Sequence, residues 1–391
     1  MASTTDPTAP ATRILTALEA GLPRMLDDIG QLVRTESPSE DPAAVADCAR
    51  TVAGLGTRLT GTEPEWLDGS GRPALRWRFG SGDRVLLLGH FDTVWPVGSL
   101  ATHPFGITGG RLTGPGCFDM KAGVAQLFHA LSVLDDLDGV SVLLTGDEEI
   151  GAPASRALIE AEARRTRAVL VLEASENGAL KTVRKGVSSY GLGIAGRAAH
   201  AGLEPHRGVN TTTELAHQIL ALSALADPAT GTTVTPTVAS SGTTRNTVPD
   251  AARLLVDVRV ETAAEQDRVD RAVRALRPVT EGASLTFTGG PDRPPLSADA
   301  SAELFELARE QGAELGLGAL RGVAVGGASD GNLTAGVGTP TLDGLGAVGG
   351  GAHADDEHVL VAELPRRTAL VARLVTALLR QSPTGSGGAT G

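Results

Sequence analysis

The chain has 391 residues, which is enough for two domains, and a globular composition with 41% hydrophobic and 20% charged residues. Its formal net charge of −12 argues against a nucleic acid or an anionic membrane as partner. No stretch approaches the roughly 20 apolar residues of a membrane span, and residues 1–10 lack the basic start and apolar run of a secretory signal. Two cysteines, Cys48 and Cys117, exclude a disulfide framework and fit a reducing compartment, so we expect a cytoplasmic protein.

Predicted helices and strands alternate up to about residue 176, which indicates a mostly parallel sheet with helices on both faces. The spacing of apolar residues predicts an amphipathic helix over 14–34. Three short apolar runs predict buried strands, at 85–88, 140–144 and 168–172. A further helix is expected to begin at Asp119 and to run to about Leu134.

A different order of elements begins at residue 185. We expect strands and helices in the order β-α-β-β-α-β, at 187–195, 210–226, 232–240, 252–260, 263–277 and 284–288. This order is that of a ferredoxin-like unit. Prolines between 291 and 295 then mark a return to helix and strand, and the last predicted element is a helix over 360–380.

The sequence therefore predicts an α/β domain at residues 1–183 and 294–381, interrupted by a ferredoxin-like α+β domain at 184–293, with a disordered tail at 382–391. An antiparallel sheet of about four strands leaves its edges open, and pairing these edges between two subunits would protect them. The inserted domain is thus expected either to dimerise or to act as a lid, and the pattern alone leaves both open.

Six residues have the side chains that a two-metal hydrolase needs: His90, Asp119, Glu148, Glu149, Glu173 and His353. Four of them follow an apolar run, and the other two lie in glycine-rich turns. Ligands of open α/β sheets bind beyond the carboxyl ends of the strands. Polar residues gathered at these ends therefore predict a site.

Imidazole and carboxylate ligands without a thiolate suit zinc, with cobalt or manganese as substitutes. Two divalent ions about 3.5–4 Å apart need a bridging carboxylate, further N and O ligands, and a water between them. His90 and His353 can each serve one metal, and Asp119, which follows a glycine-rich turn, can bridge both.

The adjacent pair Glu148 and Glu149 points in two directions, so one can bind metal while the other meets the water as general base. Asp92 lies two residues from His90 on the same face of the expected strand. It can accept the second ring N–H of His90 and fix its tautomer.

Each of these residues alone has an ordinary structural explanation. An Asp-Glu-Glu run is usually a solvated loop, and a histidine at a strand end is more often a packed or surface residue than a ligand. His129 and His217 lie inside apolar helical patterns and are expected to be packing or surface residues, and Cys117 a small packing residue. The joint order of the six residues, with their flanking glycines, favours a site.

Three segments resemble signatures of the M20 family of metallopeptidases, at residues 89–94, 114–123 and 145–151. Within that family the chain most resembles the glutamate carboxypeptidase branch. Acetylornithine deacetylase, succinyl-diaminopimelate desuccinylase and aminoacylase also belong to the family. The resemblance covers roughly residues 14–379, and it makes 1–183 and 294–381 the catalytic domain.

The resemblance implies five metal ligands: His90 and Glu173 for one ion, Glu149 and His353 for the other, and Asp119 as the bridge. It also implies that Glu148 is the general base and Asp92 the partner of His90. Ala174 stands where the family usually has a proline after the acid. Glu357 follows His353 by four residues, as in many members, and the sequence gives it no role.

Residues 196–202 resemble the family segment whose histidine reaches the active site of the partner subunit. The resemblance therefore implies a homodimer in which His200 polarises the scissile carbonyl, an oxyanion-hole role. Asn246 and Arg259 match substrate-binding positions, and the planar fork of an arginine suits a substrate carboxylate. The setting of Arg259 beside Asn246 favours this role over that of a surface strand residue. Residues 329–332 resemble a further loop that lines the pocket.

The function expected from all of this is a zinc-dependent exopeptidase with two Zn²⁺ per chain. It would cleave an amide next to a free carboxylate and release a C-terminal amino acid such as glutamate. The alternative is a deacylase of N-acyl amino acids with the same machinery. A third possibility, from another class, is a non-catalytic metal-binding scaffold, which the retention of all six residues disfavours.

Overall fold

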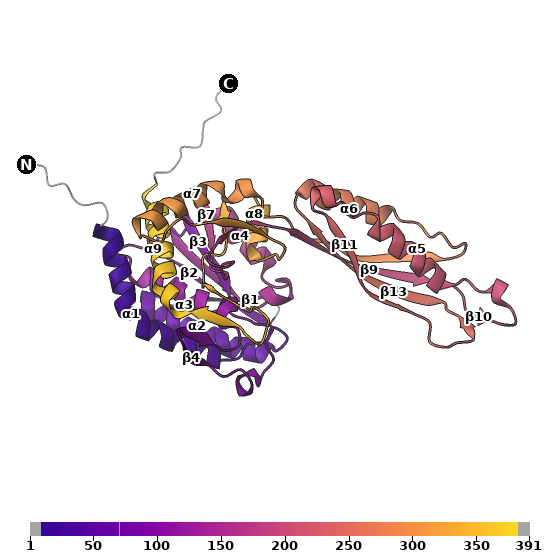
Figure 1. Ribbon diagram of the computed structural model, residues 1–391, viewed down its shortest axis with the longest axis horizontal. Coiled ribbons are helices and arrows are strands. Elements are labelled where there is room, and N and C mark those ends of the chain that lie inside the picture. Colours follow the sequence, from indigo (N-terminus) through magenta and orange to yellow (C-terminus); the bar gives the residue numbers. More distant parts are fainter. Residues whose placement is uncertain (1–8, 70, 382–391) are drawn as a thin grey trace, which may run out of the picture. The chain divides into compact units, whose positions relative to one another are not determined.

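The computed structural model describes residues 9–69 and 71–381, which form two compact units (Figure 1). Unit 1 holds the described parts of Met1–Val183, Ala298–Ala324 and Ser329–Gly391, and unit 2 consists of Arg184–Ser297 and Val325–Ala328. The tail expected to be disordered, 382–391, lies outside the described residues. None of the helices in these ranges is long and apolar enough to cross a membrane.

The core of unit 1 is a sheet whose described strands follow the order β1-β2-β6-β3-β7-β16. Their bounds are Glu65–Gly69, Arg72–Arg78, Val140–Thr145, Val85–His90, Ala168–Val171 and Thr341–Leu342. Strands β6, β3, β7 and β16 run parallel, and β2 and β1 extend this sheet antiparallel. Every residue of β3 and β6 is buried, which explains why both sequences are nearly continuous apolar runs.

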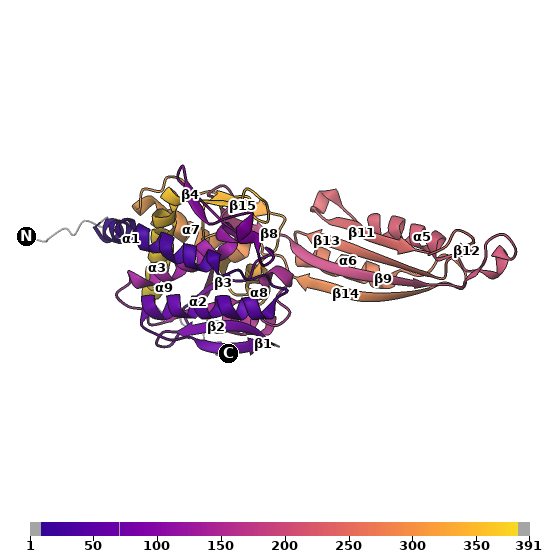
Figure 2. The same ribbon diagram turned by 90° about the horizontal axis from the view of Figure 1, so that it is seen from below.

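Helices cover both faces of this sheet (Figure 2). On β3, Val85 and Leu87 join the cluster formed with α1, α2, α3 and α9, whereas Leu86 and Leu88 pack with α4 and α8. This split follows from the alternation of side chains along a strand. The helices of unit 1 are α1 (Ala9–Arg34), α2 (Pro42–Thr60), α3 (Ala122–Ser132), α4 (Arg156–Arg165), α7 (Ala298–Glu314), α8 (Asp330–Gly336) and α9 (Leu364–Arg380).

Short strands bring distant segments of unit 1 together. Strands β17 (Gly349–Gly350), β18 (His358–Leu360), β5 (Arg111–Thr113) and β4 (Gly106–Thr108) form a small antiparallel sheet in that order. It places the turn 351–357 beside the loop that carries Asp119. A further pair consists of β8 (Leu180–Arg184) and β15 (Gly322–Val325).

The helix expected to begin at Asp119 starts later, at Ala122, so that prediction was wrong at its N-terminal end. Asp119 and Met120 have non-helical dihedrals, φ −116°, ψ 97° and φ −129°, ψ 37°. The N–H of Asp119 is donated over 3.0 Å to the carboxylate of Glu357. A residue 238 positions away in the chain thus contacts this non-helical turn. The last helix is also shorter than expected, because 358–360 is a strand.

Unit 2 contains an antiparallel sheet in the order β11-β13-β9-β14, with α5 and α6 on one of its faces (Figure 1). Tyr190, Leu192 and Ile194 alternate along β9 and pack against these two helices. The order of elements is the expected β-α-β-β-α-β, with a short pair, β10 and β12, added. The bounds are β9 (Gly186–Ala195), β10 (Ala199–His200), α5 (Thr211–Ser223), β11 (Thr233–Ser241), β12 (Thr247–Val248), β13 (Ala251–Val260), α6 (Ala263–Ala275) and β14 (Ser284–Arg293). The predicted fold class, a mostly parallel α/β sheet interrupted by a ferredoxin-like α+β unit, is confirmed.

Candidate metal centre

Three neighbouring parallel strands deliver the first part of the site. His90 is the last residue of β3, Glu148 and Glu149 follow β6, and Glu173 follows β7. Because β6, β3 and β7 are adjacent and parallel, their carboxyl ends meet at one edge of the sheet. The turns before α3 and after β17 add Asp119 and His353.

The distances divide these residues into two halves that share Asp119. Nε2 of His90 lies 3.4 Å from Oδ1 of Asp119 and 3.4 Å from Oε1 of Glu173. Nε2 of His353 lies 3.4 Å from Oδ2 of Asp119 and 3.2 Å from Oε2 of Glu149. Each half therefore uses a different oxygen of the same carboxylate. A carboxylate oxygen of Glu148 lies within 4.8 Å of the ligand atoms of His90 and Glu173.

The site fits divalent metal ions. Within 9–69 and 71–381, Nε2 of His90 and Oε1 of Glu149 are buried and lack a hydrogen-bond partner, which is costly unless a ligand satisfies them. The N–O separations of 3.2–3.4 Å also match ligand spacing around a metal. A tetrahedral ion with bonds of about 2.0–2.1 Å has ligands about 3.3–3.4 Å apart. Imidazole nitrogens and carboxylate oxygens are ligands that zinc accepts.

Asp92 orients both sides of the cluster. Nδ1 of His90 lies 3.0 Å from the carbonyl oxygen of Asp92 and 3.3 Å from its Oδ1, so Asp92 accepts this ring N–H and leaves Nε2 for a metal. The contact to the carbonyl is the shorter one. The same carboxylate accepts the backbone N–H groups of Glu148 and Glu149, each over 3.2 Å, and the hydroxyl of Ser39 over 2.6 Å. One buried side chain thus links the metal-facing histidine to the Glu148–Glu149 turn.

The electrostatic field of the cluster favours positive charge. Burial lowers the pKa of His90, but the nearby carboxylates of Asp119, Asp92 and Glu173 raise it more, so the pKa lies well above its ordinary value. Asp119 and Glu149 raise the pKa of His353 to about 10. Burial raises the pKa of Asp119, but the neighbouring His353 and His90 lower this pKa by more, so it lies well below its usual range. The same field that stabilises an imidazolium would stabilise a divalent cation.

Backbone conformation directs two of these side chains. His353 has φ +61°, a left-handed conformation that is uncommon outside glycine and is associated with functional sites. Gly116 has φ +68° in the turn before Asp119, and a Cβ there would lie 2.4 Å from Cγ2 of Thr93. The turn therefore requires glycine at this position.

The expected substrate-contacting residues lie in unit 2. His200 is exposed on β10, which pairs with β12, and the N–H of Ala201 is donated over 2.9 Å to the carbonyl oxygen of Asn246. Nδ1 of His200 accepts the N–H groups of Gly202 and Leu203, each over 3.1 Å. The ring proton is therefore on Nε2, which is left as a donor.

Arg259 lies at the opposite end of the sheet from His200. Arg259 pairs with Val187 on the neighbouring strand β9. The other end of β13, which lies nearer β10, begins at Ala251, and Ala251 pairs with Ala195. The eight steps from residue 251 to residue 259 span about 27 Å at 3.4 Å per residue. The expectation that Arg259 lies beside Asn246 is therefore wrong within one chain, because the length of β13 separates them. The Nε and Nη2 groups of Arg259 donate hydrogen bonds to the two carboxylate oxygens of Asp257, over 2.9 and 3.0 Å.

Comparison with known proteins identifies the chain. A sequence profile described as peptidase family M20/M25/M40 matches residues 86–377. This chain belongs to that family. It is 30% identical to carboxypeptidase G2 of Pseudomonas sp. (strain RS-16), with 90% of this chain and 89% of the relative covered. It is also 30% identical to succinyl-diaminopimelate desuccinylase of Methylorubrum populi, over 76% of this chain and 83% of the relative.

Solved structures show the same fold. Aminopeptidase PepT of Bacillus cereus superposes with a TM-score of 0.74 and 22% identity, covering 92% of this chain and 99% of that one. The M20 assignment made from the sequence is thus confirmed, and the protein is a hydrolase of peptide or amide bonds. Two groups of its described residues could hold a metal ion, and His90 belongs to both: one adds Glu148 and Glu173, the other Asp119 and Glu149.

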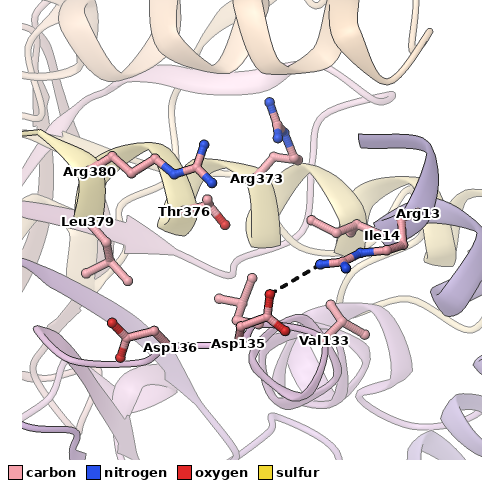
Figure 3. A pocket seen from close by; sticks show the side chains of 10 residues that line it. Arg13, Ile14, Val133, Asp135, Asp136, Arg373, Thr376, Leu379 and Arg380 are labelled. Atoms are coloured by element: carbon pink, nitrogen blue, oxygen red, sulfur yellow. Dashed lines mark hydrogen bonds and ion pairs between the residues drawn. The ribbon is translucent and has the colours of Figure 1, made fainter. Parts of the chain in front are cut away.

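A separate cavity of about 240 Å³ in unit 1 contains none of these M20 site residues (Figure 3). It lies between the ends of α3 and α9 and the start of α1, and an ion pair of 3.2 Å joins Arg13 to Asp135 at its edge. Both partners of that pair are exposed, so the pair contributes little. The chemistry of the family lies at the strand ends instead.

Two residues that support the site gave no signal of that role in the sequence. Ser39 donates to Asp92 from 53 residues away, and Glu357 accepts N–H groups of the Asp119 turn from about 240 residues away. The only available signal for Glu357 was its position four residues after His353.

Proposed function

We propose that this M20 hydrolase is a two-zinc exopeptidase that cleaves an amide next to a free carboxylate and releases a C-terminal amino acid such as glutamate. The observation that carries the proposal is the pair of half-sites, each with an imidazole nitrogen, that share the two oxygens of Asp119. In this proposal five residues hold the two ions, with cobalt or manganese as possible substitutes: His90, Asp119, Glu149, Glu173 and His353.

The two ions, when bound, would polarise the scissile carbonyl and make water acidic enough to attack near neutral pH. Glu148 would take the proton of the attacking water and pass it to the leaving amine. Its half-buried carboxylate lies within 4.8 Å of the ligand atoms of His90 and Glu173, close enough to reach a water bound in that half-site. Asp92 would hold His90 and the Glu148 backbone in place for this transfer.

His200 would donate its Nε2–H to the oxyanion that forms on the carbonyl. The two backbone N–H groups at Nδ1 support this role, because they keep the proton on Nε2. Arg259 would bind the substrate carboxylate and Asn246 would bind another polar group of the substrate. Arg259 would do so through Nη1, which does not contact Asp257 and donates to the carbonyl oxygen of Gly326 over 3.5 Å.

The positions of these residues support the proposal of a homodimer. Two extended residues span at most about 7 Å, far less than the about 27 Å between the two ends of β13. A dipeptide-sized substrate therefore cannot contact Arg259 and His200 of one chain. If both act on one substrate, His200 and Asn246 come from a second subunit. The open edges of the unit 2 sheet, β11 and β14, offer surfaces for such pairing.

The second candidate is a deacylase of N-acyl amino acids with the same machinery, which the similarity to a desuccinylase favours. The name of the carboxypeptidase relative, of which this chain covers 89%, favours the first candidate. A non-catalytic metal-binding scaffold would need no general base beside the metal ligands. The presence of Glu148 there therefore disfavours the scaffold. A cytoplasmic location stays a prediction, supported by two cysteines that are both free and buried.

The test is a hydrolysis screen with zinc, cobalt and manganese. Its substrates are N-acyl amino acids and dipeptides that end in glutamate, aspartate or a neutral residue. We expect release of the C-terminal residue, fastest with glutamate. Activity on acyl amino acids alone would favour the deacylase. No turnover with any metal, in a protein that binds two ions, would support the scaffold.

A further inference from the structure

Glu357 is a buried carboxylate that contacts the backbone of the metal-ligand turn. Its side chain belongs to unit 1, and the residue is 4% exposed. Oε1 accepts the N–H of Phe118 over 2.8 Å and the N–H of Asp119 over 3.0 Å. Oε2 accepts the N–H of Gly116 over 2.9 Å and the indole N–H of Trp95 over 2.7 Å.

Four donors on two oxygens require a carboxylate. A glutamine has one acceptor oxygen, and its NH₂ group would face two of these donors. A hydrophobic residue would leave all four donors without this partner, three of them buried backbone N–H groups, at a considerable cost. The residue type at 357 therefore follows from the conformation of the turn 116–119 and not from packing alone.

The turn that Glu357 holds has one consequence for the site. Through three backbone hydrogen bonds Glu357 fixes the turn 116–119, from which the side chain of Asp119 faces His90 and His353. Glu357 also lies four residues from His353, at the other end of the turn 353–357. One carboxylate thereby fixes the shared ligand relative to the turn that carries a terminal ligand.

We propose that Glu357 is a positioning residue of the dinuclear centre, which sets the Asp119 carboxylate between the two half-sites. This inference rests on the proposed ligand role of Asp119. Because Asp119 serves both halves, the loss of Glu357 weakens the binding of both ions. A residue that only stabilises the fold would lower thermal stability and leave the affinity for both ions unchanged.

The experiment compares the parent with Glu357→Gln and a matched control, Glu214→Gln. Glu214 is a buried carboxylate in unit 2 that also accepts backbone N–H groups, those of Val279 and Thr280. Metal-free proteins are titrated with Co²⁺ against a competing chelator, and the visible spectrum of bound Co²⁺ reports each binding step. Thermal melting of the metal-free proteins reports the stability of the fold.

We expect both Co²⁺ dissociation constants of Glu357→Gln to rise by about 10- to 100-fold, the range found for residues that orient metal ligands. The spectrum of bound Co²⁺ should change as well. Glu214→Gln should melt at a lower temperature with both constants unchanged. Parent-like constants in Glu357→Gln would overturn the inference. A parent that binds no Co²⁺ would overturn the proposed function and this inference with it.

A second variant decides the case if Glu357→Gln does not fold. Trp95→Phe keeps one aromatic ring and removes the indole N–H on Oε2 together with the second ring of the indole. Both constants should rise in the same direction, by about tenfold or less, because three backbone donors still hold Glu357. Unchanged constants in this variant would contradict the positioning role.

Discussion

The cluster around Asp119 in unit 1 and the segment around His200 in unit 2 differ in how many of their neighbouring side chains come from the same chain. In unit 1 the metal-facing atoms are held by a buried network that runs from Ser39 through Asp92 to His90 and the Glu148 backbone. In unit 2, His200 and Asn246 are exposed, and Arg259 lies about 27 Å away along β13. The proposed homodimer accounts for this difference, because it completes the substrate contacts of one chain with His200 and Asn246 of a second.

The largest expected effect is on the chemical step in unit 1. Glu148→Gln should keep both metals and the fold but lower kcat by about 10²–10⁴-fold, because it removes the proton carrier and leaves the half-sites intact. Steady-state kinetics with metal analysis of the same sample measures this. Glu160→Gln, on the surface of α4, is the control and should keep parent activity. Near-normal turnover in Glu148→Gln would remove the general-base assignment.

The next effect distinguishes the shared ligand from a terminal one. His353→Ala should lower the metal content from about two ions per chain to about one, because it serves a single half-site. Asp119→Ala should lower the content further, because its two oxygens face both histidines. Elemental analysis after dialysis is the measurement. Equal content in the parent and both variants would contradict the ligand set.

A smaller effect is expected at Arg259 in unit 2. Arg259→Ala should lower kcat/KM for substrates with a free α-carboxylate by about 10- to 150-fold, which corresponds to a charge-assisted hydrogen bond of about 1.5–3 kcal/mol. An amidated substrate should lose little. Arg274→Ala, which also removes an Arg–Asp pair, is the control. An equal loss on both kinds of substrate would make Arg259 structural.

Local sequence patterns predict much of unit 1. The apolar runs that became β3, β6 and β7 are buried on both faces, so the residues that follow them had to meet at one edge of the sheet. This reasoning gathers His90, Glu148, Glu149 and Glu173 without knowledge of the fold. The family resemblance was needed to place Asp119 and His353 at the same edge of the sheet. Both lie in glycine-rich turns, and the sequence of such a turn does not show in which direction its side chains point.

Contacts between distant segments were beyond such patterns. The α3 start was misplaced because Asp119 and Met120 are non-helical, in a turn whose N–H groups bind Glu357 from about 240 residues away. Arg259 and Asn246 are 13 positions apart in the numbering, yet they lie at opposite ends of β13 because the strand is extended. The first error concerns a long-range contact that no local pattern encodes, whereas the second arose although a strand over 252–260 had been predicted.

The claim that unit 1 supplies the chemistry and a second chain supplies His200 is tested most directly by complementation. His200→Ala and Glu148→Gln, each inactive alone, are mixed under conditions of proven subunit exchange. A mixed dimer then has one site with an intact Glu148 and an intact His200 from the other chain. Activity should return to at most about a quarter of the parent value, since half the dimers are mixed and each has one such site. No recovery despite exchange, or a fully active monomer of the parent, would contradict the account.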